Sequence, residues 1–213
     1  MKKIMFNDKF GLTQAVLEGR KTMTRRIIKA PETWHGFDVY GFSVNRDNLG
    51  NVMDISLVGA DGGSIEDENG SIGMILPKYN DGEVVAVAQS YKDAGVSPYF
   101  IAEEFEPQVQ FTPGWNNKMF VKAWPLPNRI RITDMKIERL QDISDEDCLK
   151  EGISSTNAFE IGYGIDVSYY FQGENEAYYT PREAFAALID KVSGKGTWER
   201  NHYVFVYSFE LVK

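Results

Sequence analysis

The chain has 213 residues, 43% of them hydrophobic and 25% charged, a composition typical of a soluble globular protein that can bury a core. Its formal net charge of -8 argues against a protein that binds duplex DNA, because an acidic body repels phosphates. The single cysteine, Cys148, excludes a disulfide within the chain and a cysteine-based metal site, and it is typical of a reducing, cytoplasmic location. No apolar run is long enough to predict a signal peptide or a membrane span.

The first elements are a short helix and a strand. Residues 8–18 place apolar side chains on one helical face, with Asp8 as a candidate N-cap and Gly19 as the stop. Residues 22–28 alternate as a strand does.

The section from 35 to 75 is expected to be an insertion into the main domain. It is rich in Gly and Asn, and two alternating stretches, 39–44 and 52–58, predict a hairpin. The Asn-Asp-Gly turn that ends at Gly82 is followed by an apolar strand at 83–88. We therefore interpret residues 1–213 as one domain with an excursion, not as two domains.

The second half begins with a loop and ends with strong periodicity. Residues 96–117 predict a long loop, and 119–123 a brief strand. Residues 129–138 alternate, with Ile130 and Ile132 facing inward, and the change of phase at Asp134 indicates a bulge or bend.

Two helices and a final strand follow. Ser144 precedes three acids and predicts a helix that ends at Gly152. Thr180, with Pro at the first helical position and Glu183 as a capping-box partner, begins a second helix that Gly194 stops. Residues 203–212 alternate as a strand whose aromatic face is expected to be core. The order predicts an α+β fold with a mainly antiparallel sheet or barrel and peripheral helices.

The segment from Gly19 to Arg26 is the densest candidate for chemistry, and it reads GRKTMTRR. Residues 1–30 hold eight Lys or Arg and two acids, a local net charge of +6 on an acidic protein, which suits a polar or anionic ligand or a short single strand. Arg offers planar, multi-donor recognition, and a Thr hydroxyl becomes a nucleophile only when a base removes its proton. A Lys side chain can remove that proton only if its own pKa is lowered. An ordinary basic strand edge is the alternative interpretation.

Three motifs resemble, in the same order, phage-related members of the ASCH family. They are residues 1–28, residues 137–153, which include IERLQDISDED, and residues 185–210. Residues 119–121 and 129–130 also match in order, and together the matches span about half of the chain. The resemblance implies a PUA-like, mainly antiparallel β-barrel with peripheral short helices, and a role in binding RNA or a modified nucleoside.

The resemblance also implies site residues. Small bacterial members hydrolyse the amide of N4-acetylcytidine with a Lys, a Thr and a Glu, which match Lys21, Thr24 and Glu151. In that scheme Lys21 activates Thr24 or a water, and Glu151 handles a proton or orients the amide. The other polar side chains of the segment are expected to bind ligand, Arg26 by holding a base edge or a phosphate; they are Arg20, Thr22, Arg25 and Arg26. Lys21 and Thr24, three positions apart, share a pocket only if Lys21 lies in the turn before the strand.

Three functions remain open: a binding module for RNA or a modified nucleoside, an amidohydrolase for N4-acylated cytidine, and a phage or mobile-element accessory protein that binds a host protein. The family usually carries Trp, Arg and Glu on the strand after a Gly-Asp turn, whereas residues 83–90 read EVVAVAQS, which favours binding over catalysis. His35 and His202 lack partners at ligand spacing, so no metal or cofactor is expected. The sequence leaves the oligomeric state open.

Overall fold

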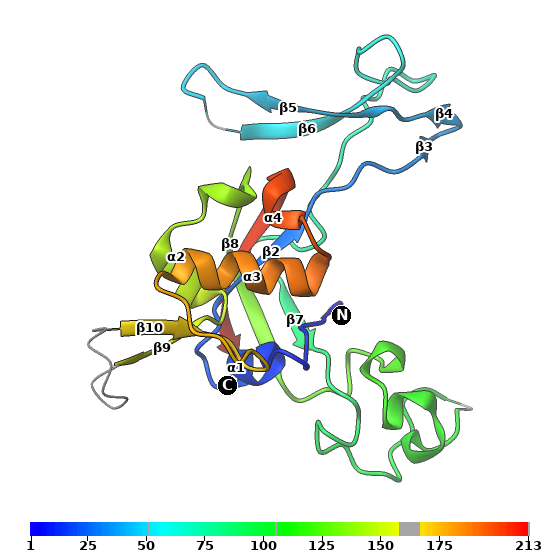
Figure 1. Ribbon diagram of the computed structural model, residues 1–213. Coiled ribbons are helices and arrows are strands. Elements are labelled where there is room, and N and C mark those ends of the chain that lie inside the picture. Colours follow the sequence, from blue (N-terminus) through cyan, green and yellow to red (C-terminus); the bar gives the residue numbers. More distant parts are fainter. Residues whose placement is uncertain (51, 105, 158–166, 213) are drawn as a thin grey trace.

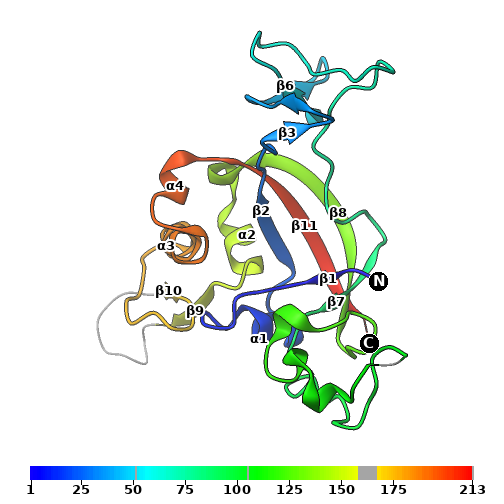
Figure 2. The same ribbon diagram turned by 90° about the vertical axis from the view of Figure 1, so that its right-hand side faces the viewer.

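A curved five-stranded sheet forms the body of the protein (Figures 1 and 2). The computed structural model describes residues 1–50, 52–104, 106–157 and 167–212. The strand order is β1-β7-β8-β11-β2, and all neighbours are antiparallel except β1 and β7. The strands are β1 (Lys3–Ile4), β2 (Met23–Ile27), β7 (Val84–Val87), β8 (Arg129–Arg139) and β11 (Tyr203–Val212).

The α+β class predicted from the sequence is confirmed, but the predicted closed barrel is not. Strands β1 and β2 are the two edges of the sheet, and no ladder between them is found in the described residues. A side chain links these edges instead, because Arg26 Nη2 donates to the carbonyl of Met5 at 2.7 Å, just after β1. β1 has two residues, too few to continue the ladder across that gap.

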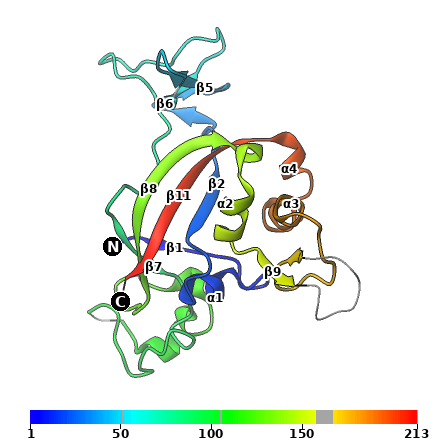
Figure 3. The same cartoon turned by 90° about the vertical axis from the view of Figure 1, so that its left-hand side faces the viewer.

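The centre of the sheet is the pairing of β8 with β11. Ile130 and Ile132 are fully buried as predicted, and the predicted irregularity also occurs, since Ser208 pairs with Asp134 but Phe209 pairs with Ile132. In β11 both faces are covered at the centre, so the valines between the aromatic residues are buried too. This occurs because α2 (Asp145–Lys150) and α3 (Pro181–Ser193) lie on one side of the sheet (Figure 3).

The N-caps predicted from the sequence are confirmed for α2 and α3 but not for the first helix. Ser144 caps α2, and Thr180 with Glu183 forms the predicted capping box of α3. The helix expected over 8–18 is shorter: α1 spans Leu12–Leu17, and its N-cap is Gly11, not Asp8. Gly11 has φ 63°, a left-handed backbone that interrupts the helix before Leu12.

The excursion is a strand-rich arm that projects from the sheet (Figure 1). It contains β3 (Thr33–Trp34), β4 (Phe37–Asp38) and the predicted hairpin of β5 (Gly41–Arg46) and β6 (Val52–Val58). The arm is anchored to the body by apolar packing, because Ile55 belongs to the main core and the Phe42 ring lies 6.3 Å from that of Tyr203.

A second, smaller core lies under the segment predicted as a loop. Tyr91, Val109 and Val121 are among its buried members. The segment is built from 3-10 turns, η1 (Val109–Phe111), η2 (Pro113–Trp115) and η3 (Lys118–Phe120). The strand predicted at 119–123 is therefore wrong: Asn117 accepts from the Met119 amide and starts a turn there.

The remaining elements are small. They are η4 (Leu140–Asp142), the hairpin of β9 (Ser154–Asn157) and β10 (Val167–Tyr170), and α4 (Thr197–Arg200). None of the helices in the described part of the chain has the length and apolar character that crossing a bilayer requires.

Removing the cap of α3 is expected to weaken the fold by a small, measurable amount. The Thr180 side chain accepts from the Glu183 amide at the start of the helix. Thr180→Ala should lower the free energy of unfolding by about 1 kcal/mol, whereas Thr180→Ser keeps the acceptor and should change it by less than about half of that. Urea unfolding measures both, and equal losses would contradict a capping role.

The thiol of Cys148 is expected to be inert in the folded protein. The side chain is fully buried, and burial raises its pKa to about 12. At pH 8 a thiol reagent should label it at least about a hundredfold more slowly than in denaturant. The pKa of the thiol is higher in the folded than in the unfolded protein, so its ionisation lowers the free energy of unfolding only above the ordinary pKa of 9.0. At pH 8 the labelling rate is therefore not affected by a loss of stability. Rapid labelling of the native protein would show that α2 opens readily.

Candidate functional site

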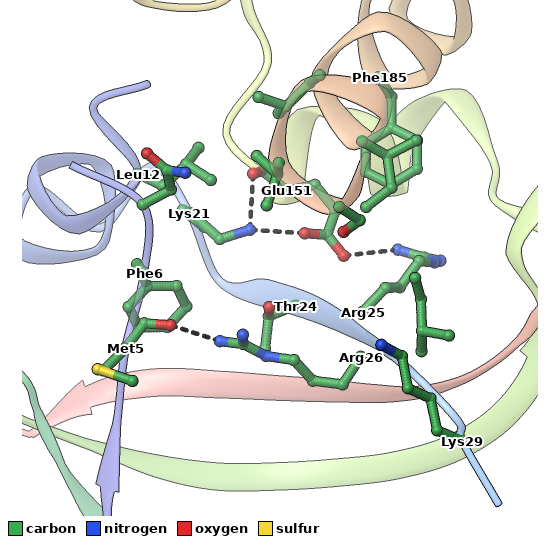
Figure 4. Close-up of a pocket in the computed structure, with 16 residues that line it drawn as sticks. Met5, Phe6, Leu12, Lys21, Thr24, Arg25, Arg26, Lys29, Glu151 and Phe185 are labelled. Carbon is green, nitrogen blue, oxygen red and sulfur yellow. Dashed lines mark hydrogen bonds and ion pairs between the residues drawn. The ribbon is translucent and has the colours of Figure 1, made fainter. Parts of the chain in front are cut away.

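A cavity of about 320 Å³ lies where β2 meets the N-terminal segment and α3 (Figure 4). One side is polar and comes mostly from β2 and the turn before it, and the opposite side is the apolar face of α3. The lining residues are Met5, Phe6, Asn7, Leu12, Lys21, Thr24, Arg25, Arg26, Ile27, Lys29, Glu151, Phe185, Leu188, Ile189, Val192 and Ser193. The cavity therefore contains all three residues predicted to be catalytic.

A buried ion pair joins two of them. Lys21 Nζ donates to Glu151 Oε2 at 2.6 Å and to the Glu151 carbonyl at 2.7 Å. The two residues are only 2% and 4% exposed, so the pair is shielded from water. An ammonium group has three N–H donors, and these bonds use two of them, so one remains for a ligand in the cavity.

Burial also changes the acidity of Lys21. Removal from water lowers its pKa, and Glu151 opposes the shift without cancelling it, while Arg25 and Arg26 add to it. The balance makes the neutral amine of Lys21 easier to form than that of an exposed lysine. A lysine in this state is the kind that can accept a proton.

Arg25 is fully occupied by protein partners. Its Nη1 donates to Glu151 Oε1 at 3.2 Å and to the sulfur of Met23, its Nε and Nη2 donate to Glu138, and Nη2 also donates to Asp147. These bonds use all five guanidinium N–H groups. Burial alone would lower the pKa of Arg25, but Glu151, Glu138 and Asp147 together raise it, so the charge is permanent.

Thr24 shares the cavity with Lys21 because Lys21 lies outside the regular strand. The Lys21 amide donates to the Ala15 carbonyl at the end of α1, and β2 starts only at Met23. The condition stated from the sequence, that Lys21 must sit in the turn, is therefore met. The Thr24 hydroxyl has no side-chain hydrogen bond in the described residues and lines the cavity, so it is available to a ligand.

Arg26, unlike Arg25, has free donors at the cavity. Apart from the bond to the Met5 carbonyl, no hydrogen bond of its guanidinium is found in the described residues, and its buried Nε has no partner. The guanidinium carbon lies 5.7 Å from the ring centre of Phe6, and Lys21 Nζ lies 5.8 Å from the same ring. Phe6 thus supports both cations at the cavity wall.

Two of the predicted ligand-binding residues lie elsewhere. Arg20 is exposed, pairs with Glu18 at 2.6 Å, and lines a separate depression next to Gly11. Thr22 does not line the cavity; its amide donates to the Lys150 carbonyl and thereby fixes the turn against α2. Arg25 lines the cavity but, as described above, has no donor left for a ligand.

Sequence reasoning missed the residues that complete the site. Phe6 lies within a segment that carried the family resemblance but had no signal of its own. Glu138 and Asp147 were assigned to a strand and a helix start, although they hold Arg25. Phe185 and Leu188 were correctly expected on the buried face of a helix, and they line the cavity as well as the core.

Nothing in the described residues forms a metal centre, since no group of three or more His, Cys, Asp or Glu side chains converges there. His35 lies 3.5 Å from Asp67 on the arm, and His202 accepts from Arg200. Comparisons with protein-family models, with curated proteins and with solved structures found no match to this chain.

Glu151 is expected to be the most costly polar residue of the site to neutralise. Glu151→Gln leaves Lys21 and Arg25 facing an uncharged amide, whereas Lys21→Met leaves Glu151 paired with Arg25. We expect Glu151→Gln to lower the free energy of unfolding by roughly 3–5 kcal/mol and Lys21→Met to cost less. Urea unfolding gives both values.

The control for this comparison is Glu146→Gln. Glu146 forms an exposed pair with Lys150 on the same helix, at 2.9 Å. That substitution should change the free energy of unfolding by less than about 0.5 kcal/mol. A larger loss for Lys21→Met than for Glu151→Gln would contradict the bridging role of Glu151.

Proposed function

We propose that the protein is an ASCH-type domain with a PUA-like fold that binds RNA or a modified nucleoside, and that the cavity beside β2 receives the base. The observation that carries the proposal is the convergence of Lys21, Thr24 and Glu151 on one cavity. The link between the sheet edges through Arg26 and Met5 supports a barrel-like closure made by a side chain.

The lining of the cavity suits a nucleobase. The volume falls at the lower end of the range of roughly 300–1,000 Å³ for small-molecule sites. A base is flat and apolar on its faces, which fits the wall of Phe185 and Leu188. Its edges carry carbonyl and ring-nitrogen acceptors, for which Lys21 and Arg26 hold unused donors.

The charge distribution supports the same ligand class. The protein is acidic overall, and Lys21 and Arg25 are paired with carboxylates, yet Arg26 and Lys29 line the cavity without an ion pair in the described residues. Binding at this local basic site is expected to weaken as salt is added, because each phosphate contact releases counterions.

A second candidate function is hydrolysis of the amide of an N4-acylated cytidine. The observation that favours it is a buried lysine of lowered pKa, paired with a carboxylate, in the same cavity as a free Thr hydroxyl. The neutral amine of Lys21 would take the Thr24 proton while the hydroxyl oxygen attacks the acyl carbon. The C–N bond then breaks as the proton passes from Lys21 to the exocyclic nitrogen, and water hydrolyses the resulting ester.

Strand β7 favours binding over catalysis. Val85, Ala86 and Val87 are fully buried and no residue of the strand lines the cavity, so β7 gives it no polar side chain. The Trp and the Arg-Glu pair that the family usually carries on this strand are absent from residues 83–90.

Incubation with N4-acetylcytidine tests both candidates. If the protein binds, titration calorimetry should detect the nucleoside, and Lys21→Met and Thr24→Val should each weaken binding about tenfold by removing one hydrogen bond to it. If it also catalyses, chromatography should show cytidine and acetate forming with the wild type and not with Thr24→Val.

The matched control is Arg20→Gln, which removes a charge next to Lys21 but outside the cavity, and it should bind like the wild type. Loss of binding in Arg20→Gln equal to that in Lys21→Met would contradict the assignment of the cavity. Absence of nucleoside and RNA binding, even at low salt, would favour a protein that binds a host protein.

A further inference from the structure

A second cavity, of about 400 Å³, lies directly beside the first. The two cavities share four residues of their common wall, Met5, Arg26, Ile27 and Lys29. The rest of the second cavity is formed by Lys3, Ile28, Ile75, Leu76, Lys78, Tyr79, Phe205 and Tyr207. The two cavities are therefore neighbours, and Arg26 lies in the wall between them.

The cations of the second cavity have no acidic partners. Lys3, Arg26, Lys29 and Lys78 line it, no carboxylate lines it, and none of the four forms an ion pair in the described part of the chain. Lys3 donates instead to the carbonyls of Met119 and Val121. Burial lowers the pKa of Lys3, and the nearby positive charge of Lys78 lowers it further. A bound anion would relieve that repulsion.

The same cavity has an apolar and aromatic floor. The Tyr79 and Tyr207 rings are 5.3 Å apart and meet edge to face, and the Tyr207 hydroxyl is occupied by the Lys78 amide. Leu76 is 72% exposed at the rim. Apolar surface beside unpaired cations matches a nucleotide, which has an anionic phosphate and a base with an apolar face.

We propose that the second cavity is a subsite for the phosphate and base of a neighbouring nucleotide, so that the ligand is a single strand of at least two nucleotides. This rests on the proposed function of the first cavity. Arg26 and Lys29, which line both cavities, would contact the phosphate that joins the two nucleotides, and Lys78 would contact the outer nucleotide.

The test compares Lys78→Glu with Lys92→Glu. Of the two cavities Lys78 lines only the second, and within the described residues its ammonium group forms no ion pair and lies 5.5 Å from the centre of the Tyr79 ring, so the fold should tolerate the change. Lys92 is also exposed, lines neither cavity, and undergoes the same change of charge. The probes are a fluorescein-labelled single-stranded RNA hexamer with one N4-acetylcytidine, followed by anisotropy, and the free nucleoside.

Lys78→Glu should weaken RNA binding roughly tenfold at low salt and reduce the slope of log affinity against log salt by about one contact, while Lys92→Glu stays within about twofold of the wild type. Binding of the free nucleoside should not change in either variant. Equal RNA affinities of the two variants would overturn the subsite, and so would a wild type that binds the nucleoside but gains nothing from RNA. Failure of the wild type to bind either probe would refute the first cavity as well.

Discussion

The carboxylate of Glu151 holds the candidate site together. One oxygen accepts from Lys21 and the other from Arg25, so a single residue at the end of α2 bridges two buried cations of the β2 segment, while Glu138 and Asp147 supply further negative charge to Arg25. Buried charges are stable only when paired and hydrogen-bonded. The pairing therefore fixes where the lysine amine lies, keeps the cavity polar on one side, and docks α2 on the sheet.

Much of the local structure could be predicted because it depends on neighbours in the sequence. The cap at Thr180, the alternation around Ile130 and Ile132, and the β5–β6 hairpin are set by short patterns. The predicted element boundaries were wrong where a local backbone conformation prevented the helix or strand that the hydrophobic pattern indicated. Gly11 adopts a left-handed φ and delays α1, and the Asn117 cap turns residues 118–120 into a 3-10 helix. Whether the sheet closes into a barrel depends on pairing between its two edge strands, which are far apart in the sequence. The hydrophobic periodicity of each strand gives no information about that pairing.

The candidate site also combines features that the sequence predicted with features that only tertiary contacts determine. The sequence pointed to Lys21, Thr24 and Glu151 through resemblance, and the three share a cavity. The sequence also predicted one role, ligand binding, for both Arg25 and Arg26, but in the structure only Arg26 has donors available to a ligand. Arg25 is satisfied by carboxylates 113, 122 and 126 positions away, whereas Arg26 keeps unused donors. Adjacent residues of one type differ in this way only through tertiary contacts, so composition alone could not distinguish them.

The contact between Lys21 and Glu151 spans 130 positions, more than half of the chain. Closing so long a loop has an entropic cost that local contacts cannot offset early in folding. During synthesis the lysine emerges long before its carboxylate, and β2 reaches β8 only through β11, so in a chain that ends before α2 the amine stays in water. The cavity thus comes into being late, together with the docked helix, and any activity it has is a property of the nearly finished polypeptide.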